Sequence, residues 1–369
     1  MKILILTNYA NGLYLFRKEL LEQLQNDGHQ ISVAVPVDEN TSKIEKLGCK
    51  VIDVQLERRG NNPIKDYRLF HTYVKLLKSY KPDIVFTYTI KPNLYGGLAC
   101  SLKKIAYICN ITGLGTAIEN QSLMSKILLA FYRISTKKAQ CVFFQNEKNR
   151  DFMNHFKIAC TNNQLLPGSG VNLQEHPFVE YPSEKFGICF LAVIRIMKDK
   201  GIEEYLSAAE IMKKRYPKVR FVLVGEYEEE TRTQYESQIN DLVKKNVISY
   251  LGHIDNVKDV MASSHVIVHP SYHEGLSNVL LEAAACGRPV LASDVHGCVE
   301  TFEQGESGIA FSSKDTQALV RAMETIMSFT EEKRRQMGIK GRKWVENHFD
   351  RNIVIEAYRA ELQKTEHKR

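Results

Sequence analysis

The sequence predicts an α/β protein made of two doubly wound, Rossmann-like domains that face each other across a cleft. With 369 residues, the chain is too long for one ordinary domain. Short apolar runs alternate with helical patterns from the first residues onward, which is typical of buried parallel strands and their crossover helices. The alternation stops at 174–185, which has two prolines and no periodicity, and then starts again. We interpret 174–185 as a linker.

The first domain is predicted over 1–172. A strand over 1–7, a helix over 13–25 and a strand over 30–35 form a β-α-β unit, whose right-handed crossover places the first loop at the carboxyl edge of the sheet. No G-x-G-x-x-G follows the first strand, which counts against a dinucleotide oxidoreductase. Gly12 in this loop could let the backbone approach a phosphate, although an ordinary turn also uses glycine. Further strands are predicted at 50–54, 84–88, 105–110, 141–144 and 165–167.

The second domain is predicted over 173–350, with a C-terminal helix over 351–369. Its strands alternate with helices at 202–216 and 232–245 and with a third helix that begins near Ser277. The strands are predicted at 186–193, 219–224, 247–251, 266–268, 290–293 and 308–311.

Charge is unevenly distributed along the chain. Residues 1–170 hold 23 Lys and Arg against 13 Asp and Glu, whereas the remainder holds 27 against 30. A basic first half indicates an anionic partner. No helix-turn-helix, zinc-finger or RNP-like pattern supports nucleic acid, so a membrane surface or a lipid-linked phosphate is favoured. The eight cysteines form no C-x-x-C pair and no run reaches the length of a membrane span, so we expect a cytoplasmic protein with free thiols.

The stretch 269–287, HPSYHEGLSNVLLEAAACG, is predicted to run from a strand through a loop into a helix. Glu274 is expected on the loop, Ser277 and Asn278 at the helix start, and Glu282 about one turn inside the helix. The amides of a helix N-terminus suit a phosphate or a hydroxyl group. Carboxylates on both sides suit a ligand with hydroxyls, because an ionised carboxylate only accepts hydrogen bonds. Two surface glutamates on an ordinary loop and helix would give the same pattern.

The stretch 195–201, RIMKDKG, also lies between a predicted strand and a predicted helix. Arg195 and Lys200 are expected at the carboxyl edge, where a pair of cations could neutralise a nucleotide diphosphate. A solvated basic loop is the alternative for an isolated R-x4-K.

Together, Glu274 and Glu282 of an E-x7-E motif and Arg195 and Lys200 of an R-x4-K-G element resemble the family 4 retaining glycosyltransferases of GT-B fold. The resemblance covers essentially the whole chain and points to enzymes of capsule, exopolysaccharide and lipid-linked oligosaccharide synthesis. It implies transfer of a hexose or N-acetylhexosamine from a UDP-sugar to a polyprenyl-(di)phosphate-linked saccharide. It implies no cofactor and no metal, in agreement with the absence of a D-x-D motif. The second domain would bind the nucleotide sugar and the first the acceptor, with the C-terminal helix packed back on the first.

The resemblance also assigns residues to roles. The implied catalytic residues are Glu274, Arg195, Lys200 and Glu119. The implied donor-binding residues are Gly12, Arg195, Lys200, Gly225, Leu251, His253, Glu274, Gly275, Leu276, Ser277, Asn278 and Glu282. The implied acceptor-side residues are Lys91, Thr112, Gly113 and Gly115.

One position departs from the family pattern. Many members have a histidine at the end of the strand that corresponds to 105–110, but this chain has none between His71 and His155. Lys91, Thr112 and Glu119 are candidates for that role, and Gly113-Leu114-Gly115 would otherwise be a flexible turn.

Two further patterns bear on ligands. His265, His269 and His273 recur every four residues, but a strand-like run and Pro270 separate them, so we expect no shared face and no metal site. The stretch 122–139 fits an amphipathic helix with basic flanks, which could lie on an anionic membrane or simply pack in the domain. Its apolar side comprises Leu123, Ile127, Phe131 and Ile134. Its basic residues are Lys126, Arg133, Lys137 and Lys138.

We therefore expect a glycosyltransferase that is peripheral on the inner face of the cell membrane. Two alternatives stay open: a GT-B UDP-sugar epimerase or hydrolase, and a non-catalytic membrane-bound scaffold subunit.

Overall fold

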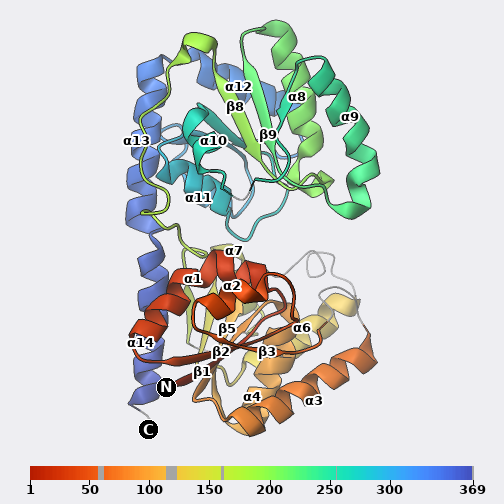
Figure 1. The fold of residues 1–369 in the computed structure, drawn as a ribbon, viewed down its shortest axis with the longest axis vertical. Helices are drawn as coiled ribbons and strands as arrows, with labels where there is room; N and C mark the ends of the chain where they lie inside the picture. The colour runs from red at the N-terminus through yellow and green to blue at the C-terminus, as the bar shows by residue number, and fades with distance from the viewer. Residues whose placement is uncertain (57–61, 114–122, 159–161, 255, 368–369) are drawn as a thin grey trace. The chain divides into compact units, whose positions relative to one another are not determined.

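The computed structural model describes residues 1–56, 62–113, 123–158, 162–254 and 256–367. The chain divides into two compact units, one of Met1–Ser169 with Asn352–Arg369 and one of Gly170–Arg351. Each unit is a parallel sheet covered by helices on both faces (Figure 1).

The first unit has seven parallel strands in the order β3-β2-β1-β4-β5-β6-β7. They are β1 (Lys2–Leu6), β2 (Gln30–Val35), β3 (Lys50–Asp53), β4 (Ile84–Tyr88), β5 (Ala106–Ile111), β6 (Cys141–Phe144) and β7 (Asn163–Leu165). Ile3 and Ile5 enter one hydrophobic cluster, whereas Leu4 and Leu6 enter another on the opposite face. This two-sided burial is why the strands are apolar almost throughout.

Helices cover the two faces of this sheet unequally. One face carries α1 (Ala10–Asn26), α2 (Thr41–Lys46) and α14 (Arg351–Glu366). The other carries α3 (Pro63–Tyr80), α4 (Gly97–Lys103), α6 (Leu123–Thr136) and α7 (Glu147–His155). Helix α1 begins three residues before the predicted start, because Tyr9 is extended and its carbonyl already accepts from the Leu13 amide at 3.2 Å. The last strand ends at Leu165, before Pro167, which has no N–H to extend the ladder.

The C-terminal helix α14 belongs to the first unit. Val354, Ile355, Tyr358 and Leu362 lie in the same cluster as β1 and α1. The hydroxyl of Tyr358 lies 2.7 Å from that of Tyr88, at the end of β4, and donates to the Asn110 side chain on β5.

The second unit has six parallel strands in the order β10-β9-β8-β11-β12-β13. They are β8 (Cys189–Val193), β9 (Arg220–Val224), β10 (Ser249–Tyr250), β11 (Val266–His269), β12 (Val290–Ser293) and β13 (Gly308–Phe311). Its helices are α8 (Ile202–Arg215), α9 (Arg232–Lys244), α10 (Lys258–Ser263), α11 (Asn278–Ala285), α12 (Thr316–Ser328) and α13 (Glu331–His348). Strand β8 starts later than predicted, because Gly187 turns with φ +84° and leaves Phe186 75% exposed.

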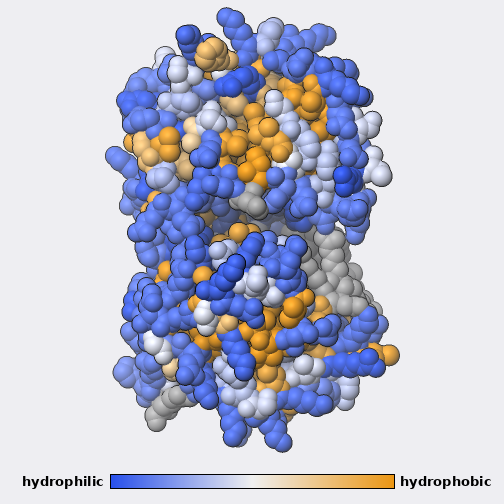
Figure 2. Space-filling view, in the orientation of Figure 1, coloured by the Kyte–Doolittle hydropathy of each residue, from blue (hydrophilic) through white to orange (hydrophobic). Residues whose placement is uncertain are grey.

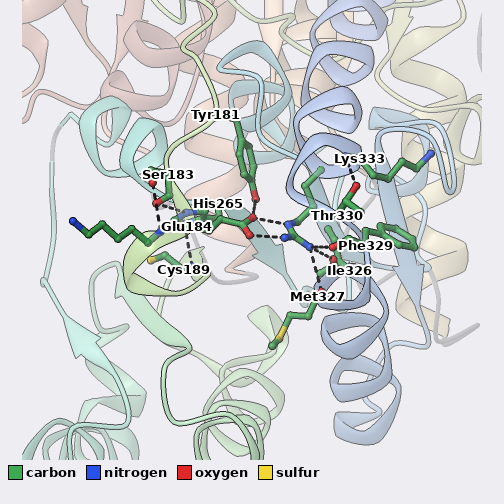
Figure 3. A network of polar contacts seen from close by, with 12 residues as sticks. Tyr181, Ser183, Glu184, Cys189, His265, Ile326, Met327, Phe329, Thr330 and Lys333 are labelled. Atoms are coloured by element: carbon green, nitrogen blue, oxygen red, sulfur yellow. Dashed lines mark hydrogen bonds and ion pairs between the residues drawn. The ribbon is translucent and has the colours of Figure 1, made fainter.

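Residues 174–185 are part of the second unit and do not form a free linker. The fully buried Arg288 donates to the carbonyl oxygens of Val179 and Glu180 at 3.0 and 2.9 Å. Glu184 accepts from Arg334 of α13 at 2.7 Å, in the network that Figure 3 shows. These contacts satisfy an irregular backbone that has no ladder of its own.

The visible face of the molecule is mainly hydrophilic, with hydrophobic patches between the hydrophilic residues (Figure 2). Among the described residues, no helix has both the length and the apolar character needed to cross a membrane. The seven cysteines in the described ranges are buried free thiols.

Candidate active site

The candidate site lies at the carboxyl edge of the second sheet. Strands β8 and β11 pair directly, so the loops that follow them, 194–201 and 270–277, leave the sheet side by side. Tyr272 N donates to Asp199 O at 2.9 Å, which ties the two loops together. Gly201 has φ +71°, and a Cβ there would lie 2.1 Å from Pro270 O, so only glycine fits this crossing.

Lys200 and Glu274 form a close ion pair between these loops. Lys200 Nζ lies 2.6 Å from Glu274 Oε1, and the two side chains are 18% and 14% exposed. Lys200 Nζ also lies 3.5 Å from Ser271 Oγ. Two motifs separated by more than seventy residues in the sequence therefore meet in one polar cluster.

His269 is the third member of this cluster. It ends β11 and is buried, with Nε2 at 2.9 Å from Glu274 Oε1 and 3.1 Å from Ser277 Oγ. Burial alone would raise the pKa of Glu274, but the hydrogen bond with His269 and the charge of Lys200 hold that pKa well below its ordinary value. Glu274 is therefore an ionised acceptor at neutral pH.

The N-terminus of α11 completes this part of the site. Ser277 is its N-cap and accepts from the Leu280 amide at 3.4 Å. The Ser277 amide donates to Gly297 O at 2.8 Å. A Cβ on Gly297 would lie 2.7 Å from Glu274 O and 2.8 Å from Gly275 O, so this glycine supports the loop. Sequence reasoning missed Gly297, whose only signal was a glycine in the loop after a predicted strand.

Two other residues of this segment have different environments. Leu276 is 8% exposed and its side chain packs in a hydrophobic cluster, so only its backbone is left to reach a ligand. Asn278 is the first residue of α11.

Glu282 lies one turn inside α11 and is half-buried. Burial raises the pKa of its carboxyl to about 7, and the positive charges of Arg351 and Lys258 lower that pKa only in part. Within the described ranges, no hydrogen-bond partner is found for this carboxyl. Glu274 and Glu282 therefore occupy separate environments with opposite pKa shifts.

The loops after β9 and β10 adjoin each other. Gly225 N donates to Gly252 O at 2.8 Å, and Tyr250 OH donates to Gly225 O at 2.9 Å. A Cβ on Gly225 would lie 1.7 Å from Ile194 O, which brings the β9 end against the start of the Lys200 loop. Leu251 and His253 are exposed on this edge.

Arg195 does not join the Lys200 cluster. Its guanidinium pairs with Glu228 at 3.1 Å and its side chain is 53% exposed. The sequence predicted that Arg195 and Lys200 act together as a pair of cations. In the structure Arg195 pairs with Glu228 and Lys200 pairs with Glu274.

The predicted acceptor-side residues lie in the first unit. Lys91 pairs with Asp66 at 2.8 Å, and Thr112 and Gly113 follow β5. Gly12 lies in the first turn of α1, where a Cβ would lie 2.7 Å from the Tyr9 ring. Gly115 and Glu119, two of the predicted residues, lie outside the described ranges.

Asn110 lies near the end of β5, where the family resemblance led us to expect a histidine, and both of its amide atoms are used internally. Its Oδ1 accepts from Tyr358, and its Nδ2 donates to Thr87 O at 3.1 Å. The nearby Thr89 has φ +71°, an unusual conformation for a β-branched residue, and its buried hydroxyl has no partner.

His265 and His269, two of the three regularly spaced histidines, have separate hydrogen-bond partners. His265 and His269 lie at opposite ends of β11, and His265 Nδ1 accepts from Cys189 N at 3.1 Å while Nε2 lies 3.3 Å from Ser183 O. In the described part of the chain, no group of three or more His, Cys, Asp or Glu could hold a metal ion.

Comparisons with known proteins place the chain among sugar transferases. Residues 176–344 match the family "Glycosyl transferases group 1", and residues 2–146 match "Glycosyl transferase 4-like". The chain is 28% identical to N,N'-diacetylbacillosaminyl-diphospho-undecaprenol alpha-1,3-N-acetylgalactosaminyltransferase of Campylobacter jejuni, over 97% of each chain. It is 29% identical to the capsular polysaccharide biosynthesis glycosyltransferase CapM of Staphylococcus aureus, over 89% of this chain and 94% of CapM.

Solved structures share the fold at lower identity. Sucrose-phosphate synthase of Thermosynechococcus elongatus has a TM-score of 0.78 at 20% identity, over 99% of this chain and 98% of the other. Anabaena HepE in complex with UDP and glucose has a TM-score of 0.81 at 18% identity, over 99% of both chains. These similarities confirm the predicted GT-B fold of two doubly wound domains.

Proposed function

We propose that this chain, which belongs to the group 1 and 4-like family of GT-B glycosyltransferases, moves a hexose or N-acetylhexosamine from a UDP-sugar to a lipid-linked saccharide. The observation that carries the proposal is the Lys200–Glu274–His269 cluster at the carboxyl edge of the second sheet. A cation and an ionised carboxylate at one sheet edge suit a ligand that has both a diphosphate and sugar hydroxyls.

The names of relatives support the substrate classes. The Campylobacter jejuni relative is an N-acetylgalactosaminyltransferase that acts on a diphospho-undecaprenol-linked sugar. An Escherichia coli relative, 25% identical over 72% of this chain and 71% of its own, is a UDP-Gal:alpha-D-GlcNAc-diphosphoundecaprenol alpha-1,3-galactosyltransferase. Both names specify alpha linkages, and an alpha linkage made from an alpha-linked UDP-sugar is retention of configuration. We extend that stereochemistry to this chain.

The chemistry that we propose is same-face substitution. The acceptor hydroxyl attacks the anomeric carbon as the bond to the β-phosphate oxygen breaks, and the leaving phosphate takes the hydroxyl proton. Lys200 and the N-terminus of α11 would stabilise the charge on that phosphate. Glu274 would accept from a hydroxyl of the transferred sugar, and Glu282 from the ribose. Arg195 would have to leave Glu228 to reach the diphosphate. We propose that the reaction needs no metal or other cofactor.

The first unit would hold the acceptor at an anionic membrane surface. The apolar side of α6 is exposed, with Ile127 at 47%, Phe131 at 40% and Ile134 at 58%, whereas the helix buries Tyr132, Ser135 and Thr136 instead. Exposed basic residues flank this side: Lys126, Arg133, Lys137 and Lys138. A helix that turns apolar and basic side chains outward together is suited to an anionic bilayer. We infer that the protein is peripheral on the inner face of the cell membrane.

The test is UDP release from a panel of UDP-sugars, with and without a membrane lipid extract. Wild type is compared with Lys200→Ala, Glu282→Ala and the control Lys340→Ala, which breaks only an exposed ion pair with Glu306. We expect release that requires the lipid fraction, that falls by roughly 10²–10³-fold in Lys200→Ala, and that is unchanged in the control.

The other outcomes separate the alternatives. Release without any acceptor would indicate an epimerase or a hydrolase. Vesicle binding without release from any UDP-sugar would contradict the transferase and favour a scaffold subunit.

A further inference from the structure

The first unit contains a cavity of about 570 Å³. The end of β3 and the residues that follow it form one wall, the N-terminal half of α3 forms another, and Lys91 closes the side next to β4. Its charged lining residues are Asp53, Lys65, Asp66, Arg68 and Lys91.

The two acids of this cavity, Asp53 and Asp66, both accept hydrogen bonds from neighbouring groups of the protein. Asp66 accepts from Lys91 at 2.8 Å, and burial together with the charge of Asp66 raises the pKa of the neighbouring Tyr95 to about 12. Asp53 accepts from the Val37 amide at 3.3 Å and from the Gln55 side chain at 3.1 Å. Lys91 therefore neutralises Asp66, whereas Asp53, held by neutral donors, keeps its charge, and the three cations of the lining outnumber the two acids.

Arg68, in contrast, forms no ion pair with any described acid, and its side chain is exposed. Lys65 lies one turn earlier on α3 and lines the same cavity. A planar guanidinium with its donors uncommitted is the side chain best suited to bind a phosphate through two hydrogen bonds. The cavity therefore offers an anion its strongest attraction at Arg68.

Apolar side chains adjoin this basic lining on the outer side of α3. Ile64 and Tyr67 are each 65% exposed, and they alternate with Lys65 and Arg68 along one turn of the helix. Helix α3 also packs against the segment Pro92–Gly96, which contacts α6 in turn.

We propose that this cavity binds the diphosphate of the lipid-linked acceptor. Arg68 and Lys65 hold the phosphates, while Ile64 and Tyr67 contact the hydrocarbon chain at the membrane surface. The Lys91–Asp66 pair forms the inner wall, where Asp66 holds Lys91. This inference rests on the proposed function, because that function supplies a lipid diphosphate as the ligand.

The test is vesicle flotation with the full-length protein. Phosphatidylcholine vesicles doped with undecaprenyl diphosphate are compared with vesicles doped with phosphatidylglycerol to the same total charge. We expect wild type to prefer the diphosphate lipid by roughly tenfold, as for one charge-assisted phosphate contact. Arg68→Ala should remove that preference and keep the phosphatidylglycerol binding. Inorganic pyrophosphate should compete only on the diphosphate vesicles.

Two further variants sharpen the result. Lys78→Ala removes one exposed cation from the last turn of α3, outside the cavity, and should behave as wild type. Asp66→Asn releases Lys91 and should strengthen the preference. Equal binding of wild type to both vesicles, or equal losses in Arg68→Ala and Lys78→Ala, would overturn the proposal. UDP release, measured on the same preparation, tests the transferase activity separately. The diphosphate site can therefore fail its test while the transferase activity is confirmed, and the reverse.

Discussion

Glu274 and Glu282 occupy one loop and helix, yet their surroundings set their charges apart at neutral pH. Glu274 keeps its carboxylate because His269 and Lys200 contact it directly. Glu282 has no such contact, and burial raises its pKa from 4.5 to about 7. The same residue type therefore gives one fixed anion and one group that titrates near physiological pH.

The first residue-scale prediction concerns Glu282 and pH. A carboxyl must be ionised to accept from both ribose hydroxyls, so we expect UDP-sugar affinity to increase as pH rises through about 7. In Glu282→Gln this pH dependence should disappear. Titration calorimetry between pH 6 and pH 8 is the measurement, and an unchanged pH profile in the variant would exclude the assignment.

Ionisation of Glu282 has the opposite effect on the stability of the fold: affinity for the donor rises with pH, whereas stability falls. The folded pKa lies above the unfolded value, so the folded state binds the proton more tightly and stability falls as pH rises from 4.5 to about 7. At pH 8, Glu282→Gln should be more stable than wild type by about 1–3 kcal/mol. Urea unfolding at pH 5 and pH 8 checks this: the gain should be present only at the higher pH.

The second residue-scale prediction concerns the Lys200–Glu274 pair. Lys200→Ala leaves a largely buried carboxylate with His269 as its remaining partner, and we expect a loss of about 2 kcal/mol in unfolding free energy. Lys200→Ala with Glu274→Gln should recover part of it, so a double-mutant cycle should give a coupling of about 1–3 kcal/mol. Additive losses would show that the pair does not interact as its 2.6 Å separation indicates.

At the scale of elements, Arg334 joins the end of one helix to the start of another and to an irregular segment. It donates to the carbonyl oxygens of Ile326, in the last turn of α12, at 2.9 Å and of the C-cap Phe329 at 2.5 Å. It also pairs with Glu184 (Figure 3). The side chain is 4% exposed. Arg334 therefore satisfies orphan carbonyls at a helix C-terminus and anchors residues 174–185 at the same time.

Arg334→Leu should lower the unfolding free energy by about 3–5 kcal/mol, because several carbonyls lose their donor and Glu184 loses its cation and keeps only the Tyr181 hydroxyl. The neighbouring Arg335 pairs with Glu332 on the surface, so Arg335→Leu should change stability by less than about 0.5 kcal/mol. Thermal denaturation of the two variants distinguishes them. Equal, small effects would contradict the anchoring role.

At the scale of the whole molecule, the chain returns to its first unit only at its end. Helix α14 supplies buried residues to the core that β1 and α1 began, and Tyr358 joins β4 and β5 through Tyr88 and Asn110. The buried Arg17 lies beside both tyrosines, and its guanidinium carbon is 5.6 Å from the centroid of the Tyr88 ring. Burial raises the pKa of both tyrosine hydroxyls, so both remain neutral donors. The first unit is therefore incomplete without residues more than 350 positions from its start.

Tyr358→Phe should lower the stability of the first unit by about 1–3 kcal/mol, because Asn110 loses its buried donor. Tyr67→Phe, at a 65% exposed position, is the matched control and should be neutral. Hydrogen exchange of β4 and β5 amides reports the first unit alone. Faster exchange in the second unit instead would contradict this role of Tyr358.

The sequence by itself determined the alternation of strands and helices, because each parallel strand is buried on both faces and must be apolar over its own length. That local property located β2, β4, β6, β12 and β13 to the residue. It also identified Lys200 and Glu274 as residues of strand-to-helix loops, since the carboxyl edge of a parallel sheet is where such loops gather.

Only the tertiary structure decided which of these loops touch. The pairing of β8 with β11 brings Lys200 to Glu274, whereas the position of Glu228 after β9 draws Arg195 elsewhere. Gly297 became recognisable as a site residue only through its close approach to Glu274, and the partners of His269 likewise follow from the fold. The pKa values of the two glutamates likewise follow from burial and from charges distant in sequence, and no local pattern of residues encodes those distances.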